Sequence, residues 1–306
     1  MAEMQSNLVR NGNGGQIRFP MFISQDDMDL IAQEFVVKDG DVFVVTYPRS
    51  GTTWTEQMVH LLVNKGEQGE QRLTDAVPWL ETLPHRPGGM IEFLKTMPQR
   101  RLFTSHLPHP LMPPLGDTTA RIVYVARNPK DVAVSTYFHN QSKLGYEGTW
   151  EEHFQEFLNG DVGFGPYFDH ILPWWQASQT EKRILFMKYE DMKHDHAGSV
   201  ARIASFLDLQ ADPQLIDRVV VLSSFKSMTS NETTNFDWIP QKADKPKHFR
   251  KGDIGDWRNH FTAEQSQQMD DRVMEKLKGS GLQFDFGDGV ILPISSGPLS
   301  QDPSNS

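Results

Sequence analysis

The stretch Val45-Thr46-Tyr47-Pro48-Arg49-Ser50-Gly51-Thr52-Thr53-Trp54 lies directly after an apolar run and directly before a helical apolar pattern. A strand, a tight turn with one glycine and a helix start bind phosphate well, because N–H groups at the helix N-terminus point toward the anion and the helix dipole favours its charge. Arg49 adds a positive charge, and three hydroxyl groups follow it. A nucleoside triphosphatase loop would need a second glycine and a Lys-Ser/Thr pair. The stretch therefore predicts a phosphate-binding loop of another kind, with an ordinary strand-to-helix turn as the alternative.

Length and composition allow one large α/β domain or two small ones, and we favour one. The chain has 306 residues, 38% of them hydrophobic, and no Pro/Gly/Ser-rich linker divides its middle, which suits one large core. Cysteine is absent, which excludes disulfides, thiolate metal sites and a cysteine nucleophile and fits a reducing compartment. A formal charge of −10 disfavours nucleic acid as a partner. We find no leader-like start and no membrane-length apolar run, so we expect a cytoplasmic protein that is not a membrane protein.

Apolar runs that alternate with amphipathic helical patterns predict a parallel sheet with helices on both faces. The predicted strands are residues 41–46, 101–104, 121–126 and 183–188, and helices are predicted over 25–35, 53–63, 132–141, 171–178, 198–207 and 212–223, with a further helix from 150. Ser24 and Thr149 each precede an acidic residue by three positions, the pattern of a capping box. Residues 1–15 are expected to be flexible, 16–24 extended, 78–89 a surface loop and 297–306 a disordered tail.

Polar motifs follow the predicted strands at the points where the strands end. These motifs are Tyr47–Thr53, Ser105-His106, Arg127 and Tyr189. Because the carboxyl ends of parallel strands meet at one edge of the sheet, where α/β proteins bind ligands, we expect the four motifs to form one shared site.

A basic run stands out in this acidic chain. Residues 242–251 contain Lys242, Lys245, Lys247, Arg250 and Lys251 with a single acidic residue. Such a cluster is typical of a site for a small anionic ligand, and a solvated lysine-rich loop is the alternative.

Three segments, in this order and spacing, closely resemble the cytosolic sulfotransferase family: Thr46–Trp54, Tyr124–Ser135 and Phe249–Thr262. Shorter matches occur at residues 105–108, 148–150, 189–192 and 224–226. The resemblance covers residues 16–285, which we expect to be the sulfotransferase domain. It implies a single α/β domain with a central parallel sheet flanked by helices, related to the P-loop nucleoside monophosphate kinases.

The resemblance also implies a sulfuryl donor, 3′-phosphoadenosine 5′-phosphosulfate (PAPS), and its product, adenosine 3′,5′-bisphosphate (PAP), with no metal. The loop would hold the 5′-phosphosulfate, Trp54 would stack on the adenine, and arginine forks with close glycine backbone would suit the 3′-phosphate. The residues so implied are Arg49, Ser50, Gly51, Thr52, Thr53 and Trp54 at the loop, Arg127 and Ser135 on one side of the 3′-phosphate, Phe249, Arg250, Lys251 and Gly252 on the other, and Tyr189, Ser223, Phe225 and Met228 at the nucleotide.

His106 matches the family's catalytic base. An acceptor hydroxyl loses its proton as it attacks sulfur, and a neutral imidazole can take that proton at pH 7. Arg49 would stabilise charge on the bridging oxygen of the leaving group, with help from Ser135. His109 stands in a similar loop and is the competing candidate for the base.

The chain departs from the family pattern at several positions. Arg49 and Thr104 stand where the family usually has lysines. In the family's dimerisation motif, matched by Arg258, Thr262, Ala263 and Gln267, only the threonine is retained. The sequence is therefore compatible with a monomer or a weak homodimer.

The acceptor is expected to be a small molecule, flat and partly apolar, bound near Phe22, Trp79, Phe138, His139 and Tyr146. Core packing explains each of these aromatic residues equally well. Glu81 near the same pocket would favour a cationic acceptor, with an ordinary surface-loop glutamate as the alternative. The sequence leaves open whether the product is an O-sulfate or an N-sulfamate.

Two other classes of protein remain as alternatives. A P-loop kinase would use ATP and Mg²⁺, but the loop lacks the required lysine. A non-catalytic nucleotide-binding relative would bind the nucleotide without turnover, although His106, Arg49 and Ser135 are all present.

Overall fold

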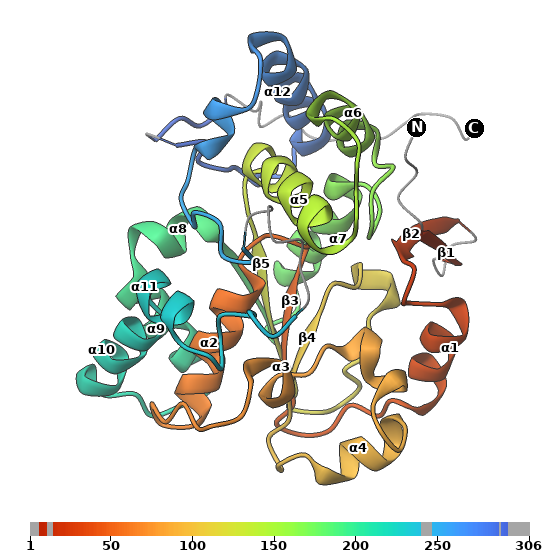
Figure 1. The fold of residues 1–306 in the computed structure, drawn as a ribbon. Coiled ribbons are helices and arrows are strands. Elements are labelled where there is room, and N and C mark those ends of the chain that lie inside the picture. The colour runs from red at the N-terminus through yellow and green to blue at the C-terminus, as the bar shows by residue number, and fades with distance from the viewer. Residues whose placement is uncertain (1–5, 11–14, 240–246, 288, 293–306) are drawn as a thin grey trace, which may run out of the picture.

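Four parallel strands form the central sheet of the computed structural model, which describes residues 6–10, 15–239, 247–287 and 289–292 (Figure 1). The strands are β3 (Val42–Thr46), β4 (Leu102–Ser105), β5 (Arg121–Ala126) and β6 (Ile184–Lys188). Their order in the sheet is β4-β3-β5-β6, and every neighbouring pair is parallel. The prediction of a parallel sheet is confirmed, with each strand within one residue of its expected bounds.

Both faces of the sheet are buried, as the continuous apolar runs require. Val42 and Val44 of β3 face one core together with helices α2 (Thr52–Val63), α9 (His196–Phe206) and α10 (Pro213–Leu222). Phe43 and Val45 face the opposite core, to which α1 (Gln25–Glu34), α5 (Pro129–Lys143), α6 (Trp150–Asn159), α7 (Tyr167–Ser178) and α12 (Ala263–Leu277) contribute. The shorter elements are α3 (Leu73–Ala76), α4 (Met90–Thr96), α8 (Tyr189–His194), α11 (Phe225–Ser230) and the 3-10 helices η1 (Leu80–His85), η2 (His109–Leu111) and η3 (Asp256–Asn259). None of the helices in the described residues is long and apolar enough to cross a membrane.

The helix starts follow their capping residues. Capping boxes at Ser24 and Thr149 begin α1 and α6, as predicted. Helix α5 begins at Pro129, three residues earlier than expected, because Asn128 caps it through the backbone N–H of Asp131 and proline suits the first helical position.

An antiparallel hairpin lies at the N-terminal end of the described chain. It pairs β1 (Ser6–Arg10) with β2 (Gln16–Pro20) and buries Val9 and Phe19 completely. Strand β1 falls within residues 1–15, which we expected to be flexible throughout; the two buried residues explain why it is ordered. The predicted tail, 297–306, lies outside the described residues.

The stretch 78–89 is not the surface loop that its Pro/Gly content suggested. Leu80, Glu81 and Leu83 are fully buried, and Trp79 forms a parallel bridge with Thr104 of β4. Leucine burial draws the short helix η1 against the sheet edge. The interpretation of Glu81 as a surface glutamate is therefore wrong.

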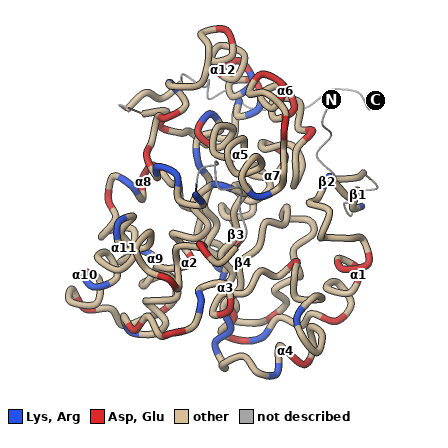
Figure 2. Tube along the Cα trace, viewed as in Figure 1, with Lys and Arg blue, Asp and Glu red and all other residues tan. Residues whose placement is uncertain are grey.

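The carboxyl ends of the four strands lie together, as predicted. Strand β3 leads into the phosphate loop, β4 into His106, β5 into Arg127 and β6 into Tyr189. Figure 2 shows Lys and Arg positions grouped beside α5 and α8, near these ends.

Candidate active site

The phosphate loop depends on Gly51. This glycine precedes α2 with φ +102° in the left-handed region, which favours glycine. A Cβ atom there would lie 2.7 Å from Cδ2 of Tyr189, so glycine is also required by the close approach of that ring. The hydroxyl groups of Thr52 and Thr46 are 2.7 Å apart. The loop is thereby held directly against the end of β3.

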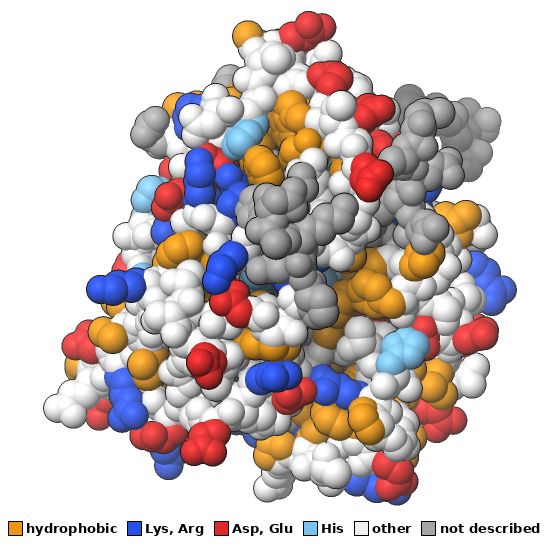
Figure 3. Space-filling model, in the orientation of Figure 1, with side chains coloured by type: hydrophobic (Ala, Val, Ile, Leu, Met, Phe, Trp, Pro, Cys, Tyr) orange, Lys and Arg blue, Asp and Glu red, His pale blue; other side chains and the backbone are white. Residues whose placement is uncertain are grey.

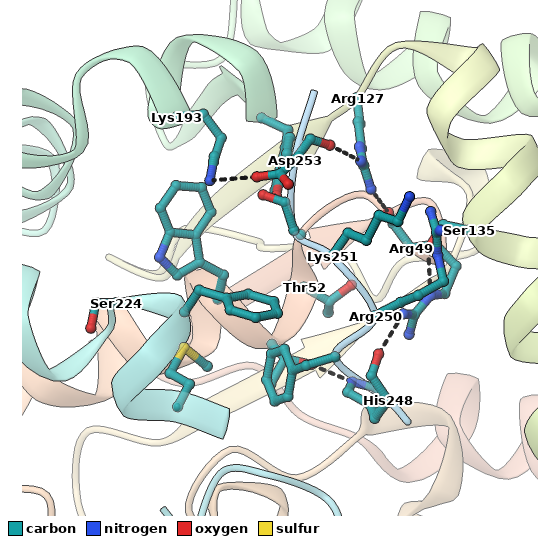
Figure 4. Close-up of a pocket in the computed structure, with 18 of the residues that line it drawn as sticks. Arg49, Thr52, Arg127, Ser135, Lys193, Ser224, His248, Arg250, Lys251 and Asp253 are labelled. Atoms are coloured by element: carbon teal, nitrogen blue, oxygen red, sulfur yellow. Dashed lines mark hydrogen bonds and ion pairs between the residues drawn. The ribbon is translucent and has the colours of Figure 1, made fainter. Parts of the chain in front are cut away.

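A cavity of about 320 Å³ opens above the loop (Figure 4). It is lined by every residue expected at the donor except Ser50 and Ser223: Arg49, Gly51, Thr52, Thr53, Trp54, Arg127, Ser135, Tyr189, Phe225, Met228, Phe249, Arg250, Lys251 and Gly252. Sequence reasoning missed five further lining residues: Lys193, His196, Ser224, His248 and Asp253. Lys193 stands one helical turn after Tyr189, a spacing that could have indicated it.

Three arginines converge at one end of this cavity. Arg49 donates from Nε to the Ser135 hydroxyl at 3.2 Å and from Nη2 to the carbonyl of His248 at 3.0 Å. Arg127 donates to the carbonyl oxygens of Arg49, at 3.3 Å, and Asp253, at 2.8 Å. Burial, together with the charges of Arg127 and Arg250, lowers the pKa of Arg49 to about 10. Positive charges that lie close together repel one another, and a bound anion offsets this repulsion. The charge at this end of the cavity therefore favours binding of an anion.

Arg250 and Lys251 are held from behind by Asp256. Its carboxylate lies 2.6 Å from Arg250 and 2.5 Å from Lys251. Burial would raise the pKa of Asp256, but hydrogen bonds from Lys251, Asn259 and Arg250 outweigh it and lower the pKa. Asp131 in turn accepts the backbone N–H groups of Gly255 and Trp257, which ties this segment to α5.

Of the basic run, Arg250 and Lys251 therefore lie at the cavity. Lys247 pairs instead with Asp237 at 2.8 Å. Lys242 and Lys245 lie outside the described residues.

Aromatic side chains form the other end of the cavity. The Trp54 ring lies edge-on to Tyr189, with centroids 5.5 Å apart, and the Tyr189 hydroxyl donates to the carbonyl of Gly252 at 2.8 Å. A Cβ atom on Gly252 would lie 2.6 Å from Cδ2 of Phe225. Figure 4 shows Lys193 and Ser224 across the cavity from Arg49, Arg127 and Ser135. The cavity is thus polarised, cationic at one end and aromatic at the other.

His106 follows β4 and faces the loop through Thr46. Its Nδ1 lies 2.9 Å from the carbonyl oxygen of Thr46, which can only accept, so Nδ1 carries the proton. The lone pair is therefore on Nε2, where it can accept a proton. Burial, with a smaller effect of the Arg49 charge, lowers the pKa of His106 to about 4, so the ring is neutral at pH 7.

Two buried side chains hold the backbone of His106. Glu81 accepts its N–H at 2.7 Å, and His170 donates from Nε2 to its carbonyl oxygen at 2.9 Å. The Tyr124 hydroxyl lies 2.9 Å from Nδ1 of His170. It can donate to Nδ1, which agrees with a proton on Nε2 of His170. Burial raises the pKa of Glu81 to about 7 and lowers that of His170 to about 3. Both residues position the imidazole without facing the donor cavity.

His109 is placed differently. Its ring packs edge-on against Trp174, 4.8 Å between centroids, in the 3-10 helix η2. No hydrogen bond joins it to the phosphate loop within the described residues. The geometry thus favours His106 over His109 as the base.

Two aromatic rings pack edge-on against His106. Trp79 and Phe164 each lie 5.3 Å from its ring, and Phe22, half-exposed, lies 5.5 Å from Trp79. Phe164 was missed by sequence reasoning. In Figure 3, hydrophobic side chains gather on the surface next to the connection between β2 and α1.

The remaining residues expected at the acceptor divide into two groups. His139 lies one helical turn from Ser135 on α5 and 6.1 Å from the His248 ring; burial and then the charges of Arg49 and Lys143 hold its pKa well below the usual range. Phe138 packs under Arg250 at 4.8 Å. Tyr146 packs against Tyr137 and His153, and the structure does not bring it to the His106 cluster.

Two donor-site expectations also need qualification. Ser50 belongs to the loop, but its side chain is fully buried and does not line the cavity. Its hydroxyl has no hydrogen-bond partner among the described residues. Ser223 is fully buried as well and reaches the cavity only through His196, 3.0 Å from its hydroxyl. No group of metal-binding side chains occurs in the described part of the chain.

A phosphate-binding loop at the strand ends of a parallel α/β fold, with a neutral histidine beside it, suits transfer of a group from an anionic donor to an acceptor that gives up a proton. The family profile for the sulfotransferase domain matches residues 39–281, which is most of the chain. The chain therefore belongs to the sulfotransferase family.

Individual relatives agree with this assignment. Mouse sulfotransferase 1B1 is 37% identical over 262 residues, 82% of this chain and 87% of the relative. Rat sulfotransferase 1 family member D1 is 35% identical over 87% of this chain and 92% of the relative. Among solved structures, mouse sulfotransferase SULT7A1 complexed with PAP has a TM-score of 0.70 at 30% identity, covering 88% of this chain and 94% of that one. Retinol dehydratase in complex with retinol and PAP has a TM-score of 0.77 at 26% identity, covering 90% of each chain.

Proposed function

We propose that this enzyme transfers the sulfuryl group of PAPS to a hydroxyl or amine of a small-molecule acceptor and releases PAP. One observation carries the proposal. The free Nε2 of His106 lies next to a loop and cation cluster built for an anion, because Thr46 contacts both His106, through Nδ1, and Thr52. The PAP bound in the similar structures of mouse sulfotransferase SULT7A1 and retinol dehydratase supports the choice of donor.

The residues at the cavity fit such a donor. The loop residues 49–53 and the N-terminus of α2 suit the 5′-phosphosulfate, and Arg127, Ser135, Arg250, Lys251 and Gly252 suit the 3′-phosphate. Arg127, which lines the cavity, has its Nε buried without a hydrogen-bond partner in the described part of the protein, and a ligand that supplies an acceptor atom would relieve this cost. Trp54, Tyr189, Phe225, Met228 and Phe249 offer the surface on which a purine would rest.

The reaction follows from these positions. Nε2 of His106 takes the acceptor's proton as the acceptor oxygen or nitrogen bonds to sulfur. The bond from sulfur to the bridging oxygen of the 5′-phosphate breaks, and that oxygen keeps the electron pair. Arg49, supported by Ser135, stabilises the charge that develops there. Positioning and electrostatics suffice, so no metal and no covalent intermediate are needed.

The acceptor is proposed to be a flat, largely apolar alcohol or phenol. The rings of Phe22, Trp79 and Phe164 beside His106 support this class. The retinol and androsterone bound by retinol dehydratase are further support. His139 would give the pocket a polar wall next to Arg49, and Phe138 would support Arg250 from behind; Tyr146 is not part of the proposed pocket.

Residues 16–285 remain the proposed domain, and the cytoplasm the proposed compartment. A monomer or weak homodimer is proposed because the residues of the degraded dimer motif serve local contacts. Arg258 donates to the carbonyl of Phe286 at 3.0 Å, and Thr262 caps α12.

Turnover tests the proposal. With excess EDTA, the enzyme is expected to transfer ³⁵S-sulfuryl label from PAPS to at least one of a simple phenol, a hydroxysteroid and an aliphatic amine. Transfer of label from γ-³²P-ATP that requires Mg²⁺ would instead establish the kinase alternative. PAP binding without transfer to any acceptor would establish a non-catalytic relative.

A further inference from the structure

His196 stands at the aromatic end of the cavity and has no assigned role. It is the first residue of α9 and lines the cavity. Its ring lies 5.0 Å from that of Trp54 at an interplanar angle of 62°. Trp54 is the residue on which the purine is proposed to rest, so His196 borders the same space.

The hydrogen bonds of Ser223 fix the tautomer of His196. The Ser223 hydroxyl donates its single proton to the carbonyl oxygen of Val219 at 2.6 Å. It can therefore only accept from Nε2 of His196, which lies 3.0 Å away. Burial, with the charge of Lys193, lowers the pKa of His196, which keeps the ring neutral at pH 7. Nε2 thus carries the proton and Nδ1 the lone pair.

Nδ1 is available to a ligand. Within the described residues no group forms a hydrogen bond with Nδ1. The atom is also not buried, since buried side-chain atoms without a partner do not include it, so a ligand can reach it. Since Nε2 is turned toward the buried Ser223 and the ring borders the cavity, the hydrogen-bonding capacity left to His196 is that of an acceptor.

Purine bases differ in what they offer such an acceptor. Adenine carries an amino group, a donor, at position 6, whereas guanine and hypoxanthine carry a carbonyl oxygen there, an acceptor. We propose that His196 selects adenine in the donor nucleotide, by accepting a hydrogen bond from the 6-amino group at Nδ1, with Ser223 as the residue that fixes its tautomer. This inference rests on the proposed donor site and adds to it the residue that recognises the base.

The test compares two nucleotides that differ at position 6. Isothermal titration of the full chain at pH 7 with adenosine 3′,5′-bisphosphate and with inosine 3′,5′-bisphosphate gives the base preference as a ratio of dissociation constants. The wild-type enzyme is expected to favour the adenosine nucleotide by about tenfold or more. In the inosine nucleotide the hydrogen bond from the 6-amino group is lost, and the carbonyl oxygen at position 6 faces Nδ1 of His196, so that two acceptors oppose each other. In the variant His196→Phe, which keeps a ring beside Trp54 but removes both nitrogens, the ratio is expected to fall close to one.

A matched control separates this effect from general damage. His194→Phe makes the same replacement two residues away, where the side chain is exposed and pairs with Asp285, and should leave the ratio unchanged. Equal binding of both nucleotides by the wild-type enzyme, or a preference retained in His196→Phe, would overturn the assignment and leave the donor site intact. Failure of the wild-type enzyme to bind either nucleotide would count against the donor site itself.

Discussion

Replacing His106 with alanine is expected to lower sulfuryl transfer by about 10²–10⁴-fold, the range for loss of a general base. PAP should still bind with nearly unchanged affinity, because His106 does not line the donor cavity. The comparison is kcat at saturating PAPS together with the dissociation constant of PAP for each variant. His109→Ala is the matched control and should retain activity, since that ring packs on Trp174.

The pH profile gives the same prediction a second readout. The base form of His106 is present above its pKa of about 4. In the free enzyme kcat/KM should therefore be insensitive to His106 ionisation from about pH 6 upward, and should fall as the pH drops toward 4 and the ring takes a proton. Near-normal turnover by His106→Ala would contradict the assignment of the base.

Replacing Arg49 with methionine is expected to lower kcat by about 10²–10³-fold, as loss of one group that stabilises developing charge typically does. The Arg49 guanidinium is partly buried, donates to the Ser135 hydroxyl and lies close enough to Arg127 and Arg250 to be affected by their charges. Its removal therefore takes positive charge from the point where the leaving oxygen is proposed to lie. Arg49 has φ +70°, and methionine and lysine carry the same backbone strain there.

Arg49→Lys is therefore the matched control for charge. It keeps a cation of the kind the family usually has at this position and should recover most of the rate, although it loses the fork that reaches both Ser135 and His248. Single-turnover rates for both variants, with PAPS saturating, measure the effect on chemistry apart from product release. If the methionine variant turned over within a few fold of the lysine variant, Arg49 would have no electrostatic role.

The parallel sheet and most of the residues that line the cavity were predictable because their signals are local. An apolar run fixes each strand, and polar residues directly after it must lie at the sheet edge. The sequence analysis began α5 at residue 132 and so missed its first turn, whereas Asn128 caps a helix that starts with Pro129. Strand β1 was missed because its stabilising contacts come from pairing with β2 across a polar connection.

The rest of the site depends on contacts between distant segments. Nothing local to residues 78–89 shows that Glu81 is buried, since its partner is the backbone of His106, the residue after β4. Likewise, the role of His196 depends on the hydroxyl group of Ser223, the residue that follows α10. Tyr146 shows the converse: an aromatic residue near the site in sequence packs into a neighbouring cluster instead.

Recognition of the 3′-phosphate distinguishes a site for PAPS from a site for other adenine nucleotides, and isothermal titration without metal measures it. Adenosine 3′,5′-bisphosphate should bind far more tightly than adenosine 5′-monophosphate, because Arg127, Ser135, Arg250 and Lys251 line the cavity together and each charged contact contributes about 1.5–3 kcal/mol. Equal binding of the two nucleotides, or no binding of either, would contradict the account.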